Sequence, residues 1–229
     1  MPSELTWLGH ATWKLTTAEH TILVDPFLDD NPAAPAAARN VDATHILVSH
    51  GHFDHIADAA EIANRCSATV IANYEIATWL TKKHVVQNTI GMNLGGSVAV
   101  PFGRVKMTLA FHSSQLPDGS YGGNPGGFLL TLKDGLKIYF ACDTALFGDM
   151  ELIARGGLDV AVLPIGDLFT MGPEDAVEAT RLLAPRIVIP SHFGTWPPIE
   201  QNASEWAERI KEQTGARPVV LKPGEGFEL

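Results

Sequence analysis

The segment from Ser49 to His55, which reads Ser-His-Gly-His-Phe-Asp-His, constrains this chain more than any other stretch. It places three imidazoles and one carboxylate close together, directly after the apolar run from Ile46 to Val48. Imidazole nitrogen and carboxylate oxygen are the ligands that zinc and related transition metals take in open catalytic sites. The pattern therefore predicts a buried strand that ends in a metal site.

Three further ligand-type side chains stand where later apolar strands end: His112, Asp143 and His192. Loops at strand ends are free to carry chemistry while the sheet fixes their origins, so we expect these side chains to gather at one site. The full set of expected metal ligands is His50, His52, Asp54, His55, His112, Asp143 and His192. This set exceeds what one four-coordinate ion needs. Two ions about 3.5–4 Å apart that share one carboxylate fit it better.

Composition narrows the class of protein. The chain has 229 residues, 45% of them hydrophobic and 18% charged, which is typical of a globular protein, and we expect a single domain over residues 1–229. A net charge of −10 disfavours nucleic acid as a partner, because phosphate binding relies on clustered Lys and Arg. No apolar stretch reaches the roughly 20 residues of a membrane span.

The N-terminal residues show no signal-peptide pattern, and Cys66 and Cys142 form no C-x-x-C motif. We therefore expect a reduced, cytoplasmic protein that acts on a small-molecule substrate. Whether it forms a homo-oligomer is left open.

Periodicity and turn residues predict a mixture of hairpins and strand–helix–strand units. Thr17 to His20 and Asp134-Gly135 indicate hairpin turns, and residues 29–40 read as a loop because prolines interrupt them. Strands are expected at 4–8, 11–17, 21–24, 44–49, 69–72, 98–101, 105–111, 128–132, 137–141, 160–164, 187–190 and 218–221. Helices are expected at 56–65, 74–82, 146–154, 173–183 and 203–213. The mixture favours α/β sheets with helices outside and excludes a regular (βα)₈ barrel, the fold of amidohydrolases that begin with H-x-H.

The H-x-H-x-D-H pattern, followed by His, Asp and His, resembles the metallo-β-lactamase superfamily of metal-dependent hydrolases over nearly the whole chain. Trp7 to Ala11 (W-L-G-H-A) and Thr170 to Ala176 (T-M-G-P-E-D-A) are similar to a compact subgroup related to lactonases that open ascorbate-phosphate rings. The resemblance implies a four-layer αβ/βα sandwich, with two mixed β-sheets flanked by helices.

The resemblance also implies how the ligands divide. One ion would be held by His50, His52 and His112, and a second by Asp54, His55 and His192, with Asp143 bridging the two. The superfamily often has Gly where Cys142 stands, a departure beside the ligand that leaves metal binding intact. Its oxygen-reducing di-iron members usually carry Glu in place of His52, so His at this position favours hydrolysis.

Several other residues are candidates for supporting roles. Asp25 is expected behind the site, where it would accept the second N–H of a ligand histidine, and the alternative is that it only forms the turn before Pro26. His10, in a Gly-His-Ala turn, either contacts substrate or stabilises the turn. Tyr121 and Asn124, in the glycine-rich loop 113–127, and Thr195, after His192, are candidate substrate contacts, although a plain connector explains the loop equally well.

We therefore expect a hydrolase in which a hydroxide bridging two divalent ions cleaves a small-molecule ester or lactone. Zinc is the first choice of metal, with manganese, iron or nickel as alternatives. Asp54 is the expected catalytic residue, orienting the water and accepting its proton while coordinating. Two alternatives stay open: a phosphodiesterase acting on cyclic nucleotides or lipids, and a metal-binding or sensing protein without turnover.

Overall fold

The computed structural model describes residues 2–229. Within it the chain forms two compact units. Unit 1 comprises the chain up to Leu94 together with Ser113–Pro125 and Leu221–Leu229, and unit 2 comprises Gly95–His112 and Gly126–Val220. The single-domain organisation over residues 1–229 stays a prediction. No helix within residues 2–229 has the length and apolar character needed to cross a membrane.

Unit 1 contains a seven-stranded mixed sheet in the order β14-β1-β2-β3-β4-β5-β6. Its strands are β1 (Glu4–Trp7), β2 (Trp13–Thr16), β3 (Thr21–Val24), β4 (His45–Val48), β5 (Thr69–Asn73), β6 (Thr89–Met92) and β14 (Gly226–Glu228). The pairs from β14 to β3 are antiparallel, and those from β3 to β6 are parallel. Every residue of β4 is buried, as expected for a parallel strand with both faces covered.

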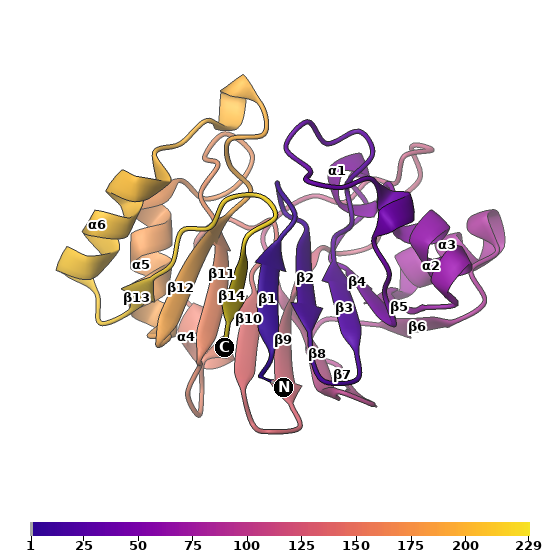
Figure 1. Cartoon of the computed structure of the whole chain (residues 1–229), viewed down its shortest axis with the longest axis horizontal. Helices are drawn as coiled ribbons and strands as arrows, with labels where there is room; N and C mark the ends of the chain where they lie inside the picture. The colour runs from indigo at the N-terminus through magenta and orange to yellow at the C-terminus, as the bar shows by residue number, and fades with distance from the viewer. Residues whose placement is uncertain (1) are drawn as a thin grey trace. The chain divides into compact units, whose positions relative to one another are not determined.

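Helices cover the parallel half of this sheet. The helical segments of unit 1 are η1 (Ala38–Asn40), α1 (Phe53–Ile56), α2 (Ala59–Cys66) and α3 (Tyr74–His84). The two longer helices, α2 and α3, pack on β4, β5 and β6 (Figure 1). Apolar side chains of α2 and α3, including Ile62, Ile76 and Leu80, form one buried cluster with those of β4 and β5.

Unit 2 contains a second seven-stranded mixed sheet, in the order β13-β12-β11-β10-β9-β8-β7. Its strands are β7 (Ser97–Val100), β8 (Gly103–Leu109), β9 (Gly126–Leu132), β10 (Lys137–Phe140), β11 (Val160–Pro164), β12 (Ile187–Ser191) and β13 (Arg217–Pro218). Strands β7 to β10 pair antiparallel, and β10 to β13 pair parallel. Each sheet therefore has one strand, β3 or β10, at which antiparallel pairing gives way to parallel pairing.

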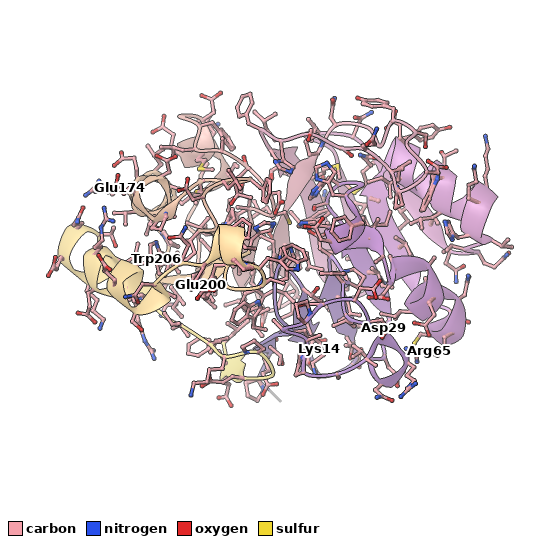
Figure 2. All side chains as sticks on the ribbon, turned by 90° about the horizontal axis from the view of Figure 1, so that it is seen from above. Lys14, Asp29, Arg65, Glu174, Glu200 and Trp206 are labelled. Carbon is pink, nitrogen blue, oxygen red and sulfur yellow. The ribbon has the colours of Figure 1, made fainter. Side chains whose placement is uncertain are left out.

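The helical segments of unit 2 are α4 (Met150–Ile153), α5 (Pro173–Leu183), η2 (Pro197–Ile199) and α6 (Ala203–Gln213). Helices α5 and α6 lie side by side and pack on β11 and β13 (Figure 1). Trp206 anchors α6 in the apolar cluster with only 1% of its surface exposed (Figure 2). Pro173 at the start of α5 and Glu174 and Asp175 in its first turn agree with the expected helix-start signal.

The structure corrects several predicted elements. The helix expected at 56–65 is two helices, α1 and α2, because Asp58 leaves the helical ladder and its N–H donates to the carbonyl of Pro26. The helix expected at 146–154 shortens to α4. Edge strands β6 and β14 were missed because they are short and contain Gly91 and Gly226. The strand expected at 218–221 is β13, and η1 lies inside the predicted loop 29–40.

Candidate metal centre

The histidine motif lies at the end of β4, as its apolar lead-in predicts. His52 is the residue before α1, and Asp54 and His55 occupy the first turn of that helix. His50 and His55 are fully buried, while His52 and Asp54 are partly exposed. A strand end followed at once by a helix turn thus brings candidate ligands from both elements to one place.

Asp25, at the end of β3, is the hub of the unit 1 ligands. Its Oδ2 accepts hydrogen bonds from His55 Nδ1 at 2.9 Å and from Ser49 Oγ at 2.6 Å, and its Oδ1 accepts the Ser49 N–H at 2.7 Å. Donation from Nδ1 fixes the His55 tautomer, so that Nε2 carries the lone pair that a metal needs. The contact has the geometry expected for Asp25, and its role behind a metal ligand stays a prediction.

Ser49 was missed as a functional residue at the sequence level. Its hydroxyl oxygen lies 2.9 Å from His50 Nδ1 while it donates to Asp25. Because the hydroxyl proton goes to Asp25, the serine oxygen accepts from His50 Nδ1, which again leaves Nε2 as the basic nitrogen. The position of Ser49 between a buried strand and the first ligand was the available signal.

His50 and His52 converge through their ring nitrogens. His50 Nε2 and His52 Nδ1 are 3.0 Å apart, and the ring centroids are 4.6 Å apart. Two ligands bound to one tetrahedral ion at about 2.0–2.1 Å lie roughly 3.3 Å from each other. The pair therefore has a spacing that suits a shared metal ion.

His10 lies inside unit 1 and not at its surface. Its side chain is fully buried, and Nε2 is 3.1 Å from Asp54 Oδ2. Its ring also makes edge contacts with Phe27 and His55, at centroid distances of 5.8 and 5.7 Å. The structure thus places His10 next to an expected ligand, which the sequence did not reveal.

Side-chain carboxylates hold the loop that follows Asp25 by accepting hydrogen bonds from its backbone N–H groups. Asp58 accepts the backbone N–H groups of Leu28 and Asp29. Burial raises the pKa of the Asp58 carboxyl, and these two N–H donors oppose that shift. Asp29 in turn accepts the N–H of Ala38, and Arg65 donates to the carbonyls of Ala38 and Val41. Asp29 and Arg65, both labelled in Figure 2, thus hydrogen-bond to the same residue, Ala38.

In unit 2, two of the expected ligands approach one carboxylate oxygen of the third. Asp143 Oδ2 lies 3.1 Å from His192 Nε2 and 3.6 Å from His112 Nε2. Asp143 and His192 are buried, and the His112 side chain is 13% exposed. Strands β8, β10 and β12 are not sequential neighbours, yet their ends deliver these residues to one place, as the strand-end argument predicted.

Four residues at these strand ends adopt left-handed backbone conformations: His10 (φ 54°), Asp25 (φ 47°), Cys142 (φ 53°) and His192 (φ 53°). Non-glycine residues rarely adopt this conformation, and such residues cluster at functional sites. At position 142 the conformation also explains why glycine is the usual residue of the superfamily there, because glycine adopts positive φ without steric cost.

Hydrogen bonds connect the glycine-rich loop to the rest of unit 1. Ser114 Oγ accepts the Gly51 N–H, and Asn73 Nδ2 donates to the carbonyls of Gly122 and Asn124. At its tip, Asp118 accepts from Trp79 Nε1 and pairs with Lys83. The loop is therefore held in place by these contacts, and it is hydrogen-bonded to the histidine motif at Gly51.

The candidate substrate contacts differ in exposure. Tyr121 is 66% exposed, and its hydroxyl donates to Asn124 Oδ1 at 3.2 Å, so both side chains lie at the surface of unit 1. Thr195 is buried in unit 2. Their contacts with substrate stay predictions.

The candidate donor residues of unit 1 suit a divalent transition metal. Within unit 1, ring and carboxylate atoms of Asp25, His50 and His55 all lie within 4.8 Å of one another, as do those of His10, Asp54 and His55. The donor set is imidazole and carboxylate, and the tautomers of His50 and His55 are fixed by hydrogen bonds at Nδ1. This is the ligand chemistry of zinc, manganese, iron or nickel sites.

Comparison with known proteins places the chain in a family. Residues 20–193 match the model of the β-lactamase superfamily domain. The chain is 47% identical over 231 residues to a UPF0173 metal-dependent hydrolase of Pelotomaculum thermopropionicum, covering 99% of this chain and all of the relative. It is 46% identical to a UPF0173 metal-dependent hydrolase of Thermus thermophilus, covering 99% of both chains.

Solved structures of similar proteins have the same fold as this chain. Igni18, a metallo hydrolase from the archaeon Ignicoccus hospitalis, superposes with a TM-score of 0.88 at 34% identity, with both chains fully covered. The metallo-β-lactamase fold protein YhfI of Bacillus subtilis, at 15% identity and a TM-score of 0.75, shares the fold. The expected fold class of two mixed sheets flanked by helices is confirmed. The chain therefore belongs to the UPF0173 metal-dependent hydrolases of the β-lactamase superfamily, with the metallo-β-lactamase fold.

Proposed function

We propose that the protein hydrolyses a small-molecule carboxylic ester or lactone at a dinuclear metal site. In this proposal His50, His52 and His112 hold one ion, Asp54, His55 and His192 hold the other, and Asp143 is shared. The observation that carries it is the approach of two histidine Nε2 atoms, from His112 and His192, to the same Asp143 oxygen. A carboxylate flanked in this way is suited to bridge two ions.

The ions, when bound, supply a water of lowered pKa and positive charge that stabilises the carbonyl oxygen as it becomes negative. The chain's own residues do the rest. As the water oxygen bonds to the carbonyl carbon, Asp54, whose side chain is 14% exposed, accepts its proton. The bond from that carbon to the leaving oxygen then breaks, and the proton passes to the leaving alkoxide, giving an acid and an alcohol.

Exposed apolar side chains in unit 2 support an organic ester over a charged diester. Phe111, which precedes His112, is 55% exposed, and Leu168 and Phe169 are 66% and 54% exposed. Both segments are tied to Thr144, the neighbour of Asp143: the Phe111 N–H donates to its hydroxyl and the Met171 N–H to its carbonyl. The residues adjacent to the seven ligands include no Lys or Arg that would bind a phosphate.

A substrate panel tests the proposal. Zinc- or manganese-loaded protein is offered p-nitrophenyl esters of increasing acyl length, γ- and δ-lactones, and bis-p-nitrophenyl phosphate. We expect turnover of esters or lactones and a loss of about 10²–10⁴-fold in kcat for Asp54→Ala, the usual contribution of a positioned acid or base. Turnover of the diester alone makes the protein a phosphodiesterase. Metal-replete protein inert on every class favours a sensor.

A further inference from the structure

We propose that His10 is a positioning residue for Asp54: its imidazole Nε2–H donates to Asp54 Oδ2 and fixes the orientation of that carboxylate. The inference rests on the proposed function, because it takes Asp54 as both a metal ligand and the proton acceptor. It replaces substrate contact as the role of His10 in this site.

The contact itself supports this role. The two atoms are 3.1 Å apart, and the imidazole is fully buried while the carboxylate side chain is 14% exposed. An ionised carboxylate only accepts hydrogen bonds, so His10 is the donor and Nε2 carries the proton. A hydrogen bond to a charged group is about twice as strong as one between neutral groups, which is enough to select one carboxylate rotamer.

The backbone around His10 is shaped to hold the ring in place. Gly9 to Thr12 form a closed turn in which the Thr12 N–H donates to Gly9 and the Leu8 N–H donates to Thr12. The indole N–H of Trp7 donates to the His10 carbonyl at 2.9 Å. His10 itself adopts the left-handed conformation that L-residues usually avoid. A strained, hydrogen-bonded turn therefore fixes the position of the His10 imidazole.

Gly9 shows how closely this turn is packed. With φ of +89°, it faces the carbonyl of Ala33, which would lie 2.8 Å from any Cβ at this position. The same segment is connected to Asp25, because the Thr12 hydroxyl donates to the Asp25 carbonyl at 2.7 Å and accepts the Phe27 N–H. The turn that carries His10 and the loop that begins at Asp25 therefore form one packed support for the metal ligands of unit 1.

Two other roles for His10 fit the structure less well. A side chain with no exposed surface, packed between the rings of Phe27 and His55, does not present itself to substrate. A role as a metal ligand is not needed, because the seven proposed ligands with Asp143 shared already give each ion four.

A pair of variants separates these roles. His10→Gln keeps an N–H donor near the place of Nε2, whereas His10→Asn keeps a residue that tolerates the left-handed backbone but withdraws the donor. His20→Gln is the matched control, a histidine of the same unit whose ring contacts that of His45 at a centroid distance of 5.6 Å. The measurements are competitive Zn²⁺ titration of the chelated protein, kcat and KM on an ester, and thermal unfolding to confirm folding.

We expect His10→Asn to weaken one of the two zinc affinities by about 10–100-fold, the usual effect of losing a partner behind a metal ligand, and to lower kcat with KM unchanged. His10→Gln should recover most of both losses, and His20→Gln should match wild type.

Three results overturn the role of His10: unchanged zinc binding and kcat in His10→Asn, a raised KM with normal zinc binding, or complete loss of one zinc in both variants, which would make His10 a ligand. A wild type that binds fewer than two ions refutes the proposed function instead.

Discussion

Replacement of Gly166 by alanine is predicted to displace His192, a proposed metal ligand, without changing the identity of any ligand. Gly166 follows β11 and faces the backbone of His192, and a Cβ at this position would lie 2.3 Å from the His192 carbonyl oxygen and 3.1 Å from its Nδ1. Real Cβ atoms essentially never approach closer than 3.0 Å, so the two segments must separate by at least about 0.7 Å.

Overpacking of this kind costs about 1–3 kcal/mol, which corresponds to a fall in Tm of roughly 2–12 °C for a chain of this size. Because the atom that moves belongs to His192, we also expect about a 10-fold or greater loss of affinity for one metal ion. Differential scanning calorimetry and zinc titration measure the two effects. Gly215→Ala is the control, because nothing lies within 4 Å of a Cβ there. A Gly166→Ala protein with wild-type Tm and zinc affinity refutes the reasoning.

Three further predictions concern the surroundings of the site. Asp25→Asn removes the carboxylate that accepts hydrogen bonds from Ser49 and His55, so metal affinity should fall by about 10–100-fold and the metal content after dialysis should drop. The control, Asp134→Asn in the exposed hairpin, should bind metal normally. Full metal content in Asp25→Asn would contradict the role given to Asp25. Asp118→Asn should speed amide hydrogen exchange in residues 114–122. Hydrogen bonds from Ser120 and Trp79 hold the Asp118 pKa far below its ordinary value, so wild-type protection should persist above pH 4 and weaken as pH falls below it; equal exchange in both proteins at pH 7 would refute the anchoring. Cys142→Gly should retain its metal and change the unfolding free energy by less than about 1 kcal/mol, because relief of left-handed strain offsets the lost side chain; a large loss of stability in urea denaturation would show that the thiol packing matters more.

The sequence predicted the fold class well where apolar runs are bounded by clear turn or cap residues. Strand β11 and helices α5 and α6 agree to the residue with their expected ranges, because Pro173 starts one helix and Gly215 follows the end of another. Strands β6 and β14 were missed because an edge strand needs only one partner and carries little hydrophobic pattern. The split between α1 and α2 depends on hydrogen bonds between Asp58 and residues 26–29, which local pattern does not encode.

In the candidate site, too, local features could be predicted from the sequence and contacts between distant residues could not. Side-chain type and position after a strand are local properties, so the sequence alone could nominate the candidate ligands His50, His52, Asp54, His55, His112, Asp143 and His192. The partners of those ligands are not local. Ser49 and Asp25 are separated by 24 residues and His10 and Asp54 by 44, so only the folded chain reveals that they are hydrogen-bonded.

Metal analysis of the protein purified without chelator tests the central claim most directly. Elemental analysis of the purified chain should find about two divalent ions per chain, and removal of both should abolish hydrolysis, which zinc or manganese then restores. Asp143→Ala, which removes the proposed shared ligand, should lower the stoichiometry, whereas Gly215→Ala should leave it at two. A wild-type protein that binds one ion or none while hydrolysing its substrate at full rate would contradict the dinuclear account.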